Sequence, residues 1–182
     1  IALPDAALLR AEMLIDRITS AGLSKYNLTA TNLHNDLPKG RRILVPGQVE
    51  DDASIRLGTT DVTTTRALLQ ACRAANPAAV ILYKPHHDVE AGLRTGAVPD
   101  AAEIADVVLT KTAPIAALDA VDVVWTMTST IGCEALLRGK DVTCLGSPFY
   151  AGWGLTDDRA TPIVRRTALP TLAQLTHAVL ID

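Results

Sequence analysis

The sequence predicts an α/β domain, in which helices cover both faces of a Rossmann-like parallel sheet. Apolar segments of strand length alternate with helical patterns along most of the 182 residues. These strand segments are apolar throughout rather than alternately apolar and polar, as expected of strands buried on both faces. Hydrophobic residues, mostly Ala, Val, Leu and Ile, make up 48% of the chain, which is enough to form the core of one such domain.

The N-terminal region is expected to be a helix followed by a linker. Apolar side chains recur at helical spacing over residues 4–22, and Gly22 marks the end of this helix. A polar stretch follows as far as Gly40; it contains Asn27, Asn32, Asn35, Asp36 and Pro38. We therefore assign residues 1–38 to a helix and linker from a preceding domain, and residues 39–182 to a Rossmann-like domain. Because the chain begins with Ile1, we expect it to be part of a longer protein.

The first half of the sheet is predicted from apolar runs with clear ends. Residues 42–46 form an apolar strand, and residues 61–75 have the pattern of a helix that ends before Pro77. Residues 79–84 form the next strand, which ends at Pro85.

The second half repeats the alternation with shorter elements. Strands are expected at 106–109, 121–126 and 141–145, and helices at 113–118, 129–138 and 171–181. Gly139 stands where the helix over 129–138 is expected to stop.

Four polar clusters come directly after predicted strands. They are residues 48–52, 84–88, 126–130 and 147–153. The carboxyl ends of parallel strands share one edge of a sheet, and open α/β sheets bind ligands at that edge. We therefore expect the four clusters to form one site.

The cluster at 126–130 is rich in hydroxyl groups and precedes a helix. Thr126, Thr128, Ser129 and Thr130 stand where a helix N-terminus could bind a phosphate. The alternative is ordinary helix capping, which Ser and Thr side chains provide routinely. Both roles use the same first-turn N–H groups, so they are compatible.

The segment KPHHD (residues 84–88) supplies cationic and donor groups. Lys84 offers a positive charge, and His86 can donate to a phosphate oxygen or protonate a leaving group. The alternative is a solvated basic loop. A metal site at His86, His87 and Asp88 is not expected, because neighbouring side chains diverge in an extended chain.

Two further segments have open interpretations. In QVEDD (residues 48–52) a carboxylate could act as a nucleophile or general acid, or the segment could be a solvated acidic turn. The segment PFYAGWG (residues 148–154) holds three of the chain's six aromatic residues. Its rings could stack on a base or a sugar, or they could close the edge of the sheet.

Several classes of protein are disfavoured by composition. The net charge of −3 and the lack of basic runs with interspersed aromatics argue against nucleic-acid binding. Cys72, Cys133 and Cys144 are odd in number and lack a CxxC spacing, which favours buried thiols in a reducing compartment. No secretory signal and no apolar run of membrane-spanning length, about 20 residues, is visible.

Taken together, the ordered segments resemble the capsular polysaccharide biosynthesis family of KpsC/LipB type. The matching segments are GLSKYN, PGQVEDD, KPHHD, TSTIGCEALLRGK and CLGSPFYAGWGLTDDR, within residues 5–180. The resemblance implies a retaining β-Kdo glycosyltransferase that takes Kdo from CMP-β-Kdo and builds the poly-Kdo linker of a capsular glycolipid. It also implies that this chain is the C-terminal, nucleotide-sugar-binding half of a GT-B-like module.

The same resemblance implies roles for particular residues. Gln48, Glu50 and Asp51 match the catalytic QxED motif, in which Asp51 would be the carboxylate that acts at the anomeric carbon. The nucleotide would be bound by Lys84, His86, Thr128, Ser129, Thr130 and Glu134. Within that set His86 and the hydroxyl pair at 129–130 would contact the phosphate, and Glu134 the ribose. His87 stands where the family usually has Pro, so the backbone restraint on His86 is lost.

The implied partners are CMP-Kdo, a lipid-linked Kdo acceptor of phosphatidylglycerol type and other capsule biosynthesis proteins. No metal and no other cofactor is expected, because cationic side chains can balance a single phosphate. The implied location is cytoplasmic and peripheral at the inner membrane. Two alternatives stay open: a GT-B-like polyol-phosphate transferase of wall polymer synthesis, and a nucleotide-binding module that is inactive in isolation.

Overall fold

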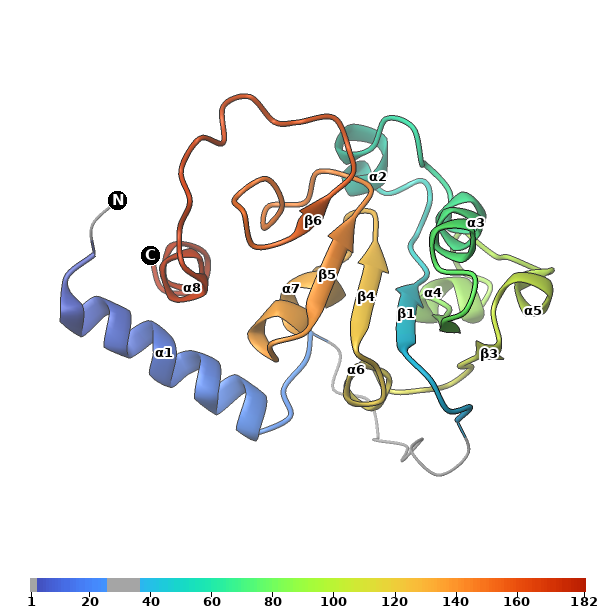
Figure 1. Ribbon diagram of the computed structural model, residues 1–182, viewed down its shortest axis with the longest axis horizontal. Coiled ribbons are helices and arrows are strands. Elements are labelled where there is room, and N and C mark those ends of the chain that lie inside the picture. Colours follow the sequence, from blue (N-terminus) through green and yellow to red (C-terminus); the bar gives the residue numbers. More distant parts are fainter. Residues whose placement is uncertain (1–2, 26–36) are drawn as a thin grey trace.

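The computed structural model describes residues 3–25 and 37–182, and its centre is a parallel sheet (Figure 1). In the described residues the sheet has six strands in the order β3-β2-β1-β4-β5-β6, all of them parallel. The strands are β1 (Arg42–Pro46), β2 (Val80–Lys84), β3 (Val107–Val108), β4 (Val123–Thr126), β5 (Asp141–Cys144) and β6 (Asp157–Asp158). The predicted Rossmann-like fold is thereby confirmed. The order of the strands reverses between β1 and β4, so the loops after these two strands diverge there.

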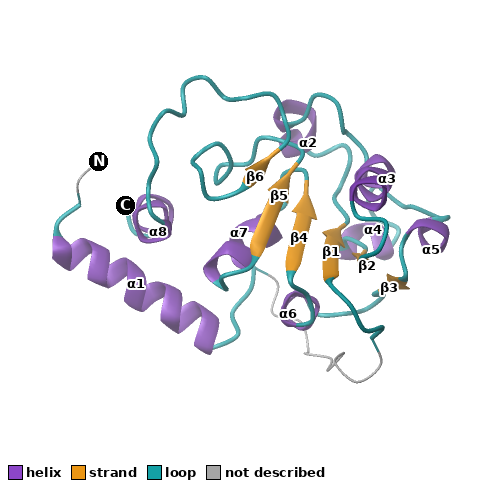
Figure 2. Ribbon diagram, viewed as in Figure 1, coloured by secondary structure: helices purple, strands orange, loops and turns teal. Residues whose placement is uncertain are grey.

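Helices lie on both sides of this sheet (Figure 2). They are α1 (Asp5–Ser20), α2 (Ala53–Gly58), α3 (Thr65–Ala75), α4 (His87–Glu90), α5 (Ala101–Ile104), α6 (Pro114–Asp119), α7 (Thr130–Leu137) and α8 (Leu172–Leu180). The pleat of the strands explains the two layers, because successive side chains point to opposite faces. In β1, Ile43 and Val45 join one buried cluster with residues of α2, α3 and α5. Leu44 joins the other cluster, with residues of α6, α7 and α8.

The first helix packs at one end of the molecule against the last one. α1 contacts α8, and its Ala11 is fully buried (Figure 1). Most of the predicted linker, including Asn27, Asn32, Asn35 and Asp36, lies outside the described residues. The division of the chain at residue 38 stays a prediction.

Where the structure departs from the sequence prediction, local capping or short length gives the reason. α3 begins at Thr65 rather than at residue 61, because the Thr64 side chain accepts a hydrogen bond from Ala67 N and caps the helix. The elements α2, α4, α5 and β6 were not predicted; none exceeds six residues, too few for a periodic pattern. α7 ends as predicted before Gly139, whose positive φ of 66° a residue without Cβ adopts readily.

Candidate functional site

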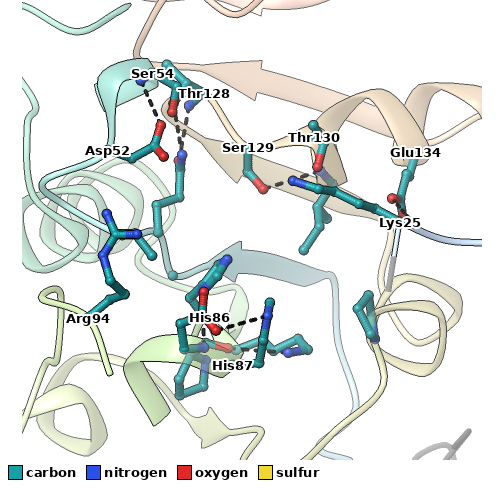
Figure 3. Close-up of a pocket in the computed structure, with 18 of the residues that line it drawn as sticks. Lys25, Asp52, Ser54, His86, His87, Arg94, Thr128, Ser129, Thr130 and Glu134 are labelled. Carbon is teal, nitrogen blue, oxygen red and sulfur yellow. Dashed lines mark hydrogen bonds and ion pairs between the residues drawn. The ribbon is translucent and has the colours of Figure 1, made fainter. Parts of the chain in front are cut away.

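A pocket of about 310 Å³ opens where the loops after β1, β2 and β4 meet (Figure 3). It lies at the carboxyl edge of the sheet, next to the point where the strand order reverses. Its lining comes from residues within four stretches, 24–25, 47–54, 84–94 and 128–134, together with Pro114. The pocket therefore occupies the place where open α/β sheets bind their ligands.

The structure brings most of the predicted site residues together here. All six residues predicted to bind the nucleotide line the pocket, and so does Gln48. Glu50 and Asp51 are not part of its lining. Residues 147–153 do not line it either, so the expectation that all four polar clusters share one site is wrong for the fourth.

The hydroxyl cluster forms the N-terminus of α7. Ser129 is the N-cap residue, and its Oγ accepts a hydrogen bond from Ile131 N at 3.3 Å. Ser129 N in turn donates to Thr126 Oγ1 at 3.1 Å. The capping interpretation is confirmed for Ser129, and the helix that it caps directs the positive end of its dipole at the pocket.

Gln48 connects the loop after β1 to the loop after β4. Its Nε2 donates to Thr128 Oγ1 at 2.8 Å, and its Oε1 accepts from Thr128 N at 3.0 Å and from Thr126 Oγ1 at 3.3 Å. Its own backbone N–H donates to Thr65 Oγ1 at the start of α3. Because the side chain is buried and its amide is occupied on both sides, Gln48 fixes the position of the residues that precede α7.

His86 faces the pocket as the N-cap residue of α4. Its Nδ1 accepts a hydrogen bond from Asp88 N at 3.3 Å, so the neutral ring carries its proton on Nε2. Burial lowers the pKa of His86, and the positive charge of a protonated His87 acts in the same direction, while Asp88 opposes them. His86 is therefore neutral at pH 7 and can donate one hydrogen bond from Nε2.

The expectation that the neighbouring His86, His87 and Asp88 side chains diverge is wrong, because His87 already begins α4. The two imidazole rings stack with their centroids 4.3 Å apart, and one ligand atom from each of the three residues fits within 4.8 Å. However, nitrogen lone pairs lie in the ring planes, and stacked rings do not direct them at one point. His86 Nδ1 is also already the acceptor for Asp88 N. Both features count against a metal ion here, although the three ligand atoms lie close enough together to hold one; the expectation of no metal stays a prediction.

Lys84 and Glu134 stand at the sides of the pocket. Lys84 is buried at the end of β2, where burial lowers the pKa of its ammonium group, and its Nζ donates to Pro85 O at 3.3 Å. The Glu134 carboxylate on α7 accepts hydrogen bonds from Ser24 Oγ at 2.8 Å and from Lys25 N at 2.9 Å. Ser24 and Lys25, which follow α1, thus form one wall of the pocket and are held there by Glu134.

The three acids of QVEDD have three different environments. Glu50 accepts a hydrogen bond from Thr65 N at 2.8 Å and so anchors the start of α3. Asp52 lines the pocket and caps α2, where its Oδ1 accepts from Ser54 N. Asp51 is exposed and forms an ion pair with Arg94, 3.0 Å from Nη2 to Oδ1. Arg94 lines the pocket, and its hydrogen bond to Asp51 holds the pKa of that carboxyl below its ordinary value.

The aromatic loop packs against α7 through Tyr150. Tyr150 is fully buried, and its hydroxyl donates to Ser129 O. Trp153 Nε1 donates to Phe149 O at 2.7 Å within the loop. Tyr150 is therefore buried against α7 rather than available to stack on a ligand, and it supports the N-cap residue Ser129 through this hydrogen bond.

Sequence reasoning gave no role in the site to several lining residues, among them Ser24, Lys25, Ser54 and Arg94, although the segment GLSKYN contains the first two. Arg94 lies in a loop without periodic pattern, and Ser24 and Lys25 are brought in from the N-terminal stretch by the tertiary fold.

None of the described helices is long and apolar enough to cross a bilayer.

The chain is similar to capsule biosynthesis proteins over nearly its whole length. A family model described as capsule polysaccharide biosynthesis protein matches residues 2–181. The capsule polysaccharide modification protein LipA of Neisseria meningitidis serogroup A is 46% identical over 166 residues, which are 90% of this chain and 23% of LipA. The lipopolysaccharide-processing protein LpsZ of Rhizobium meliloti is 43% identical over 176 residues, 94% of this chain and 40% of LpsZ.

Two solved structures of Thermosulfurimonas dismutans KpsC share the fold. One, a β-Kdo 2,7 transferase, superposes with a TM-score of 0.81 at 33% identity, over 98% of this chain and 53% of that one. The other, a β-Kdo 2,4 transferase, gives 0.85 at 32% identity, over 97% of this chain and 56% of that one. The chain thus spans about half the length of these structures and less than half of the two curated relatives.

Proposed function

Because this chain belongs to the capsule polysaccharide biosynthesis protein family, we propose that it is the nucleotide-sugar-binding half of a Kdo transferase. The reaction would take Kdo from CMP-β-Kdo with retention and build the poly-Kdo linker of a capsular glycolipid. Support comes from the likeness to the two KpsC structures, a β-Kdo 2,7 transferase and a β-Kdo 2,4 transferase, at above 30% identity over nearly all of this chain.

The observation that carries the proposal is the pairing of α7 and His86 at one pocket. The N-terminus of α7 provides backbone N–H groups and a helix dipole, and His86 faces the same pocket with a donor on Nε2. These groups suit one phosphate, whose negative charge grows as the sugar–phosphate bond breaks. Lys84 and Lys25 add positive charge to the lining, so the proposed reaction requires neither a metal nor another cofactor.

Retention follows from two displacements, for which we propose Asp51 as the nucleophile. In the first, the Asp51 carboxylate forms a bond to the anomeric carbon of Kdo, and CMP leaves with the electron pair of the broken C–O bond. In the second, a hydroxyl of the acceptor forms the new glycosidic bond, loses its proton to a base and releases Asp51. Asp51 is exposed beside the pocket, where a sugar attached to a bound CMP could meet it.

The acceptor and the location belong to the same proposal. We place the reaction on a lipid-linked Kdo acceptor of phosphatidylglycerol type, with the protein peripheral at the cytoplasmic face of the inner membrane beside other capsule biosynthesis proteins. Because this chain spans about half of the solved transferases, we expect it to bind cytidine nucleotides without turnover when it is alone.

A mutation pair tests the nucleophile in a two-domain protein that carries this chain. Asp51→Ala is expected to abolish Kdo transfer and to leave CMP affinity unchanged, whereas His86→Ala is expected to weaken both. Asp52→Asn is the matched control, since Asn also caps helices and the neighbouring carboxylate is removed. If Asp51→Ala still transfers Kdo and Asp52→Asn does not, the nucleophile is Asp52 rather than Asp51. Stabilisation of this chain by CDP-glycerol but not by CMP in a thermal shift assay would instead favour a polyol-phosphate transferase.

A further inference from the structure

Arg94 differs from the lysines that line the pocket because it forms an ion pair with Asp51. It is the guanidinium that both lines the pocket and holds Asp51, the proposed nucleophile, through the 3.0 Å ion pair. Its side chain is 41% exposed, so it is not enclosed by the protein. A guanidinium carries five N–H donors arranged to bind planar carboxylates, and the hydrogen bond to Asp51 uses one of them.

The loop that carries Arg94 is fixed to the loop that carries Asp51. Glu50 N donates to Thr95 O at 3.1 Å, and Arg94 N donates to Asp88 O at 3.2 Å. Gly96 adopts a φ of 129° and lies against Gln48 O, so closely that no Cβ would fit there. Arg94 is therefore anchored to Asp88 of α4 on one side and, through Thr95 and Gly96, to the loop that carries Asp51 on the other, so backbone contacts set its position relative to Asp51.

The chemistry of the proposed donor explains why an arginine would stand beside the nucleophile. In Kdo the anomeric carbon bears a carboxylate as a direct substituent. A nucleophilic carboxylate that approaches this carbon is therefore brought within a few ångströms of a second negative charge, and the two repel each other. A guanidinium that binds both carboxylates at once converts the repulsion into two attractive contacts.

We propose that Arg94 recognises the carboxylate of the donor sugar while it orients Asp51, and so makes the site specific for an acidic keto sugar. The inference rests on the proposed function and adds to it the residue that distinguishes an acidic donor from a neutral one. When Asp51 becomes esterified it loses its charge, and the guanidinium then pairs with the sugar carboxylate alone. Arg94 thus stabilises the sugar carboxylate both while Asp51 attacks the anomeric carbon and in the covalent intermediate.

The test compares ligand pairs that differ in one group. CMP and two non-hydrolysable CMP-Kdo analogues, one with the sugar carboxylate and one with a carboxamide there, are titrated into this chain by calorimetry. We expect the wild-type chain to bind the carboxylate analogue at least ~10-fold more tightly than the carboxamide. In Arg94→Gln this ratio should fall below ~3-fold, while the Kd of CMP changes by less than ~2-fold. Arg94→Lys keeps the positive charge but loses the planar guanidinium that can donate two parallel hydrogen bonds to a carboxylate. Its ratio of carboxylate to carboxamide affinity should therefore be intermediate.

The control and the contrary outcomes are distinct. Arg56→Gln removes an exposed arginine of α2 that does not line this pocket and should leave all three affinities as in the wild type. If wild type and Arg94→Gln prefer the carboxylate equally, Arg94 does not recognise it and the inference is overturned. If Arg94→Gln weakens CMP as much as the carboxylate analogue, the residue acts on the pocket in general and the inference is again overturned. If the wild-type chain binds none of the three ligands, the proposed function itself fails.

Discussion

The side chain of Gln48 holds Thr128 through two hydrogen bonds, one from Nε2 to Thr128 Oγ1 and one from Thr128 N to Oε1. The two residues come from different loops, after β1 and β4, on either side of the point where the strand order reverses. The position of the α7 N-terminus therefore depends on the loop that also carries the acidic residues. The glutamine of the predicted catalytic motif thus has a clear structural role, which is to position the N-terminus of α7.

Replacing Gln48 by Ala is expected to lower both stability and nucleotide affinity. Thr126 Oγ1 and Thr128 N would lose a buried acceptor, and a buried polar group without a partner costs about 1–3 kcal/mol. We expect a fall of that size in the free energy of unfolding, measured with urea, and about a 10-fold weaker Kd for CMP, measured by calorimetry. Gln70→Ala, at an exposed position of α3, is the control and should change neither. Unchanged CMP affinity in a destabilised Gln48→Ala would assign Gln48 to stability alone.

The parts of the structure that could be predicted from sequence are those with long patterns or strong end signals. The apolar runs of β1, β2 and β4 gave the parallel sheet, and Gly139 gave the end of α7. The hydroxyl cluster and His86 could be assigned to one edge because each closely follows a strand, whereas Glu134 was assigned from the family resemblance.

Other parts depend on contacts between segments that are distant in sequence. Arg94 enters the site because the backbone of Thr95 pairs with that of Glu50, a contact that no local pattern reveals. Tyr150 was a candidate for stacking on a ligand, yet it packs beneath α7, since Gly132 leaves room for its ring. The approach of Ser24 to Glu134 joins residues 110 positions apart and could not be read from spacing.

Glu134 provides a second prediction, because in the proposed nucleotide site its carboxylate would meet the ribose and distinguish it from deoxyribose. It lines the pocket and already accepts two hydrogen bonds, from Ser24 Oγ and Lys25 N, so it can accept them from a ribose that replaces these donors. A hydrogen bond to a charged group contributes about 1.5–3 kcal/mol. We expect the wild-type chain to bind CMP about 10-fold more tightly than dCMP, and Glu134→Ala to bind both alike. The affinities are measured by calorimetry, and Glu103→Ala on α5 is the control. If wild type and Glu134→Ala prefer CMP over dCMP to the same extent, Glu134 serves only to hold the N-terminal stretch.

A third prediction concerns the packing between α7 and the aromatic loop. A Cβ at Gly132 would collide with the phenol ring of Tyr150, and overpacking of a core costs about 1–3 kcal/mol. Ala is a better helix former than Gly by about 1 kcal/mol, which offsets part of that cost. We expect Gly132→Ala to destabilise the chain in urea unfolding. In the Tyr150→Phe background the same change should cost less, because the nearest atom, the hydroxyl, is gone. Additive effects of the two changes would mean that the ring moves aside freely.

The last prediction is the pH dependence of nucleotide binding, which His86 should control. Its pKa lies below the ordinary value of 6.5 because burial disfavours the charged ring, with His87, Lys84 and Lys25 acting the same way electrostatically and Asp88 opposing. A bound phosphate favours the imidazolium and raises this pKa, so binding takes up a proton as pH falls below neutrality. The affinity for CMP should therefore rise as pH decreases from 7.5 towards the lowered pKa of His86.

The free phosphate of CMP also gains a proton in this range and loses charge, which weakens binding at low pH. His86→Asn separates the two effects, because this variant retains only the titration of the phosphate. Calorimetry of the wild-type chain in buffers of different ionisation enthalpy should show proton uptake of up to about one per CMP beyond that of His86→Asn. Identical proton uptake in the two proteins would mean that His86 stays neutral in the complex and binds the phosphate only through its Nε2 proton.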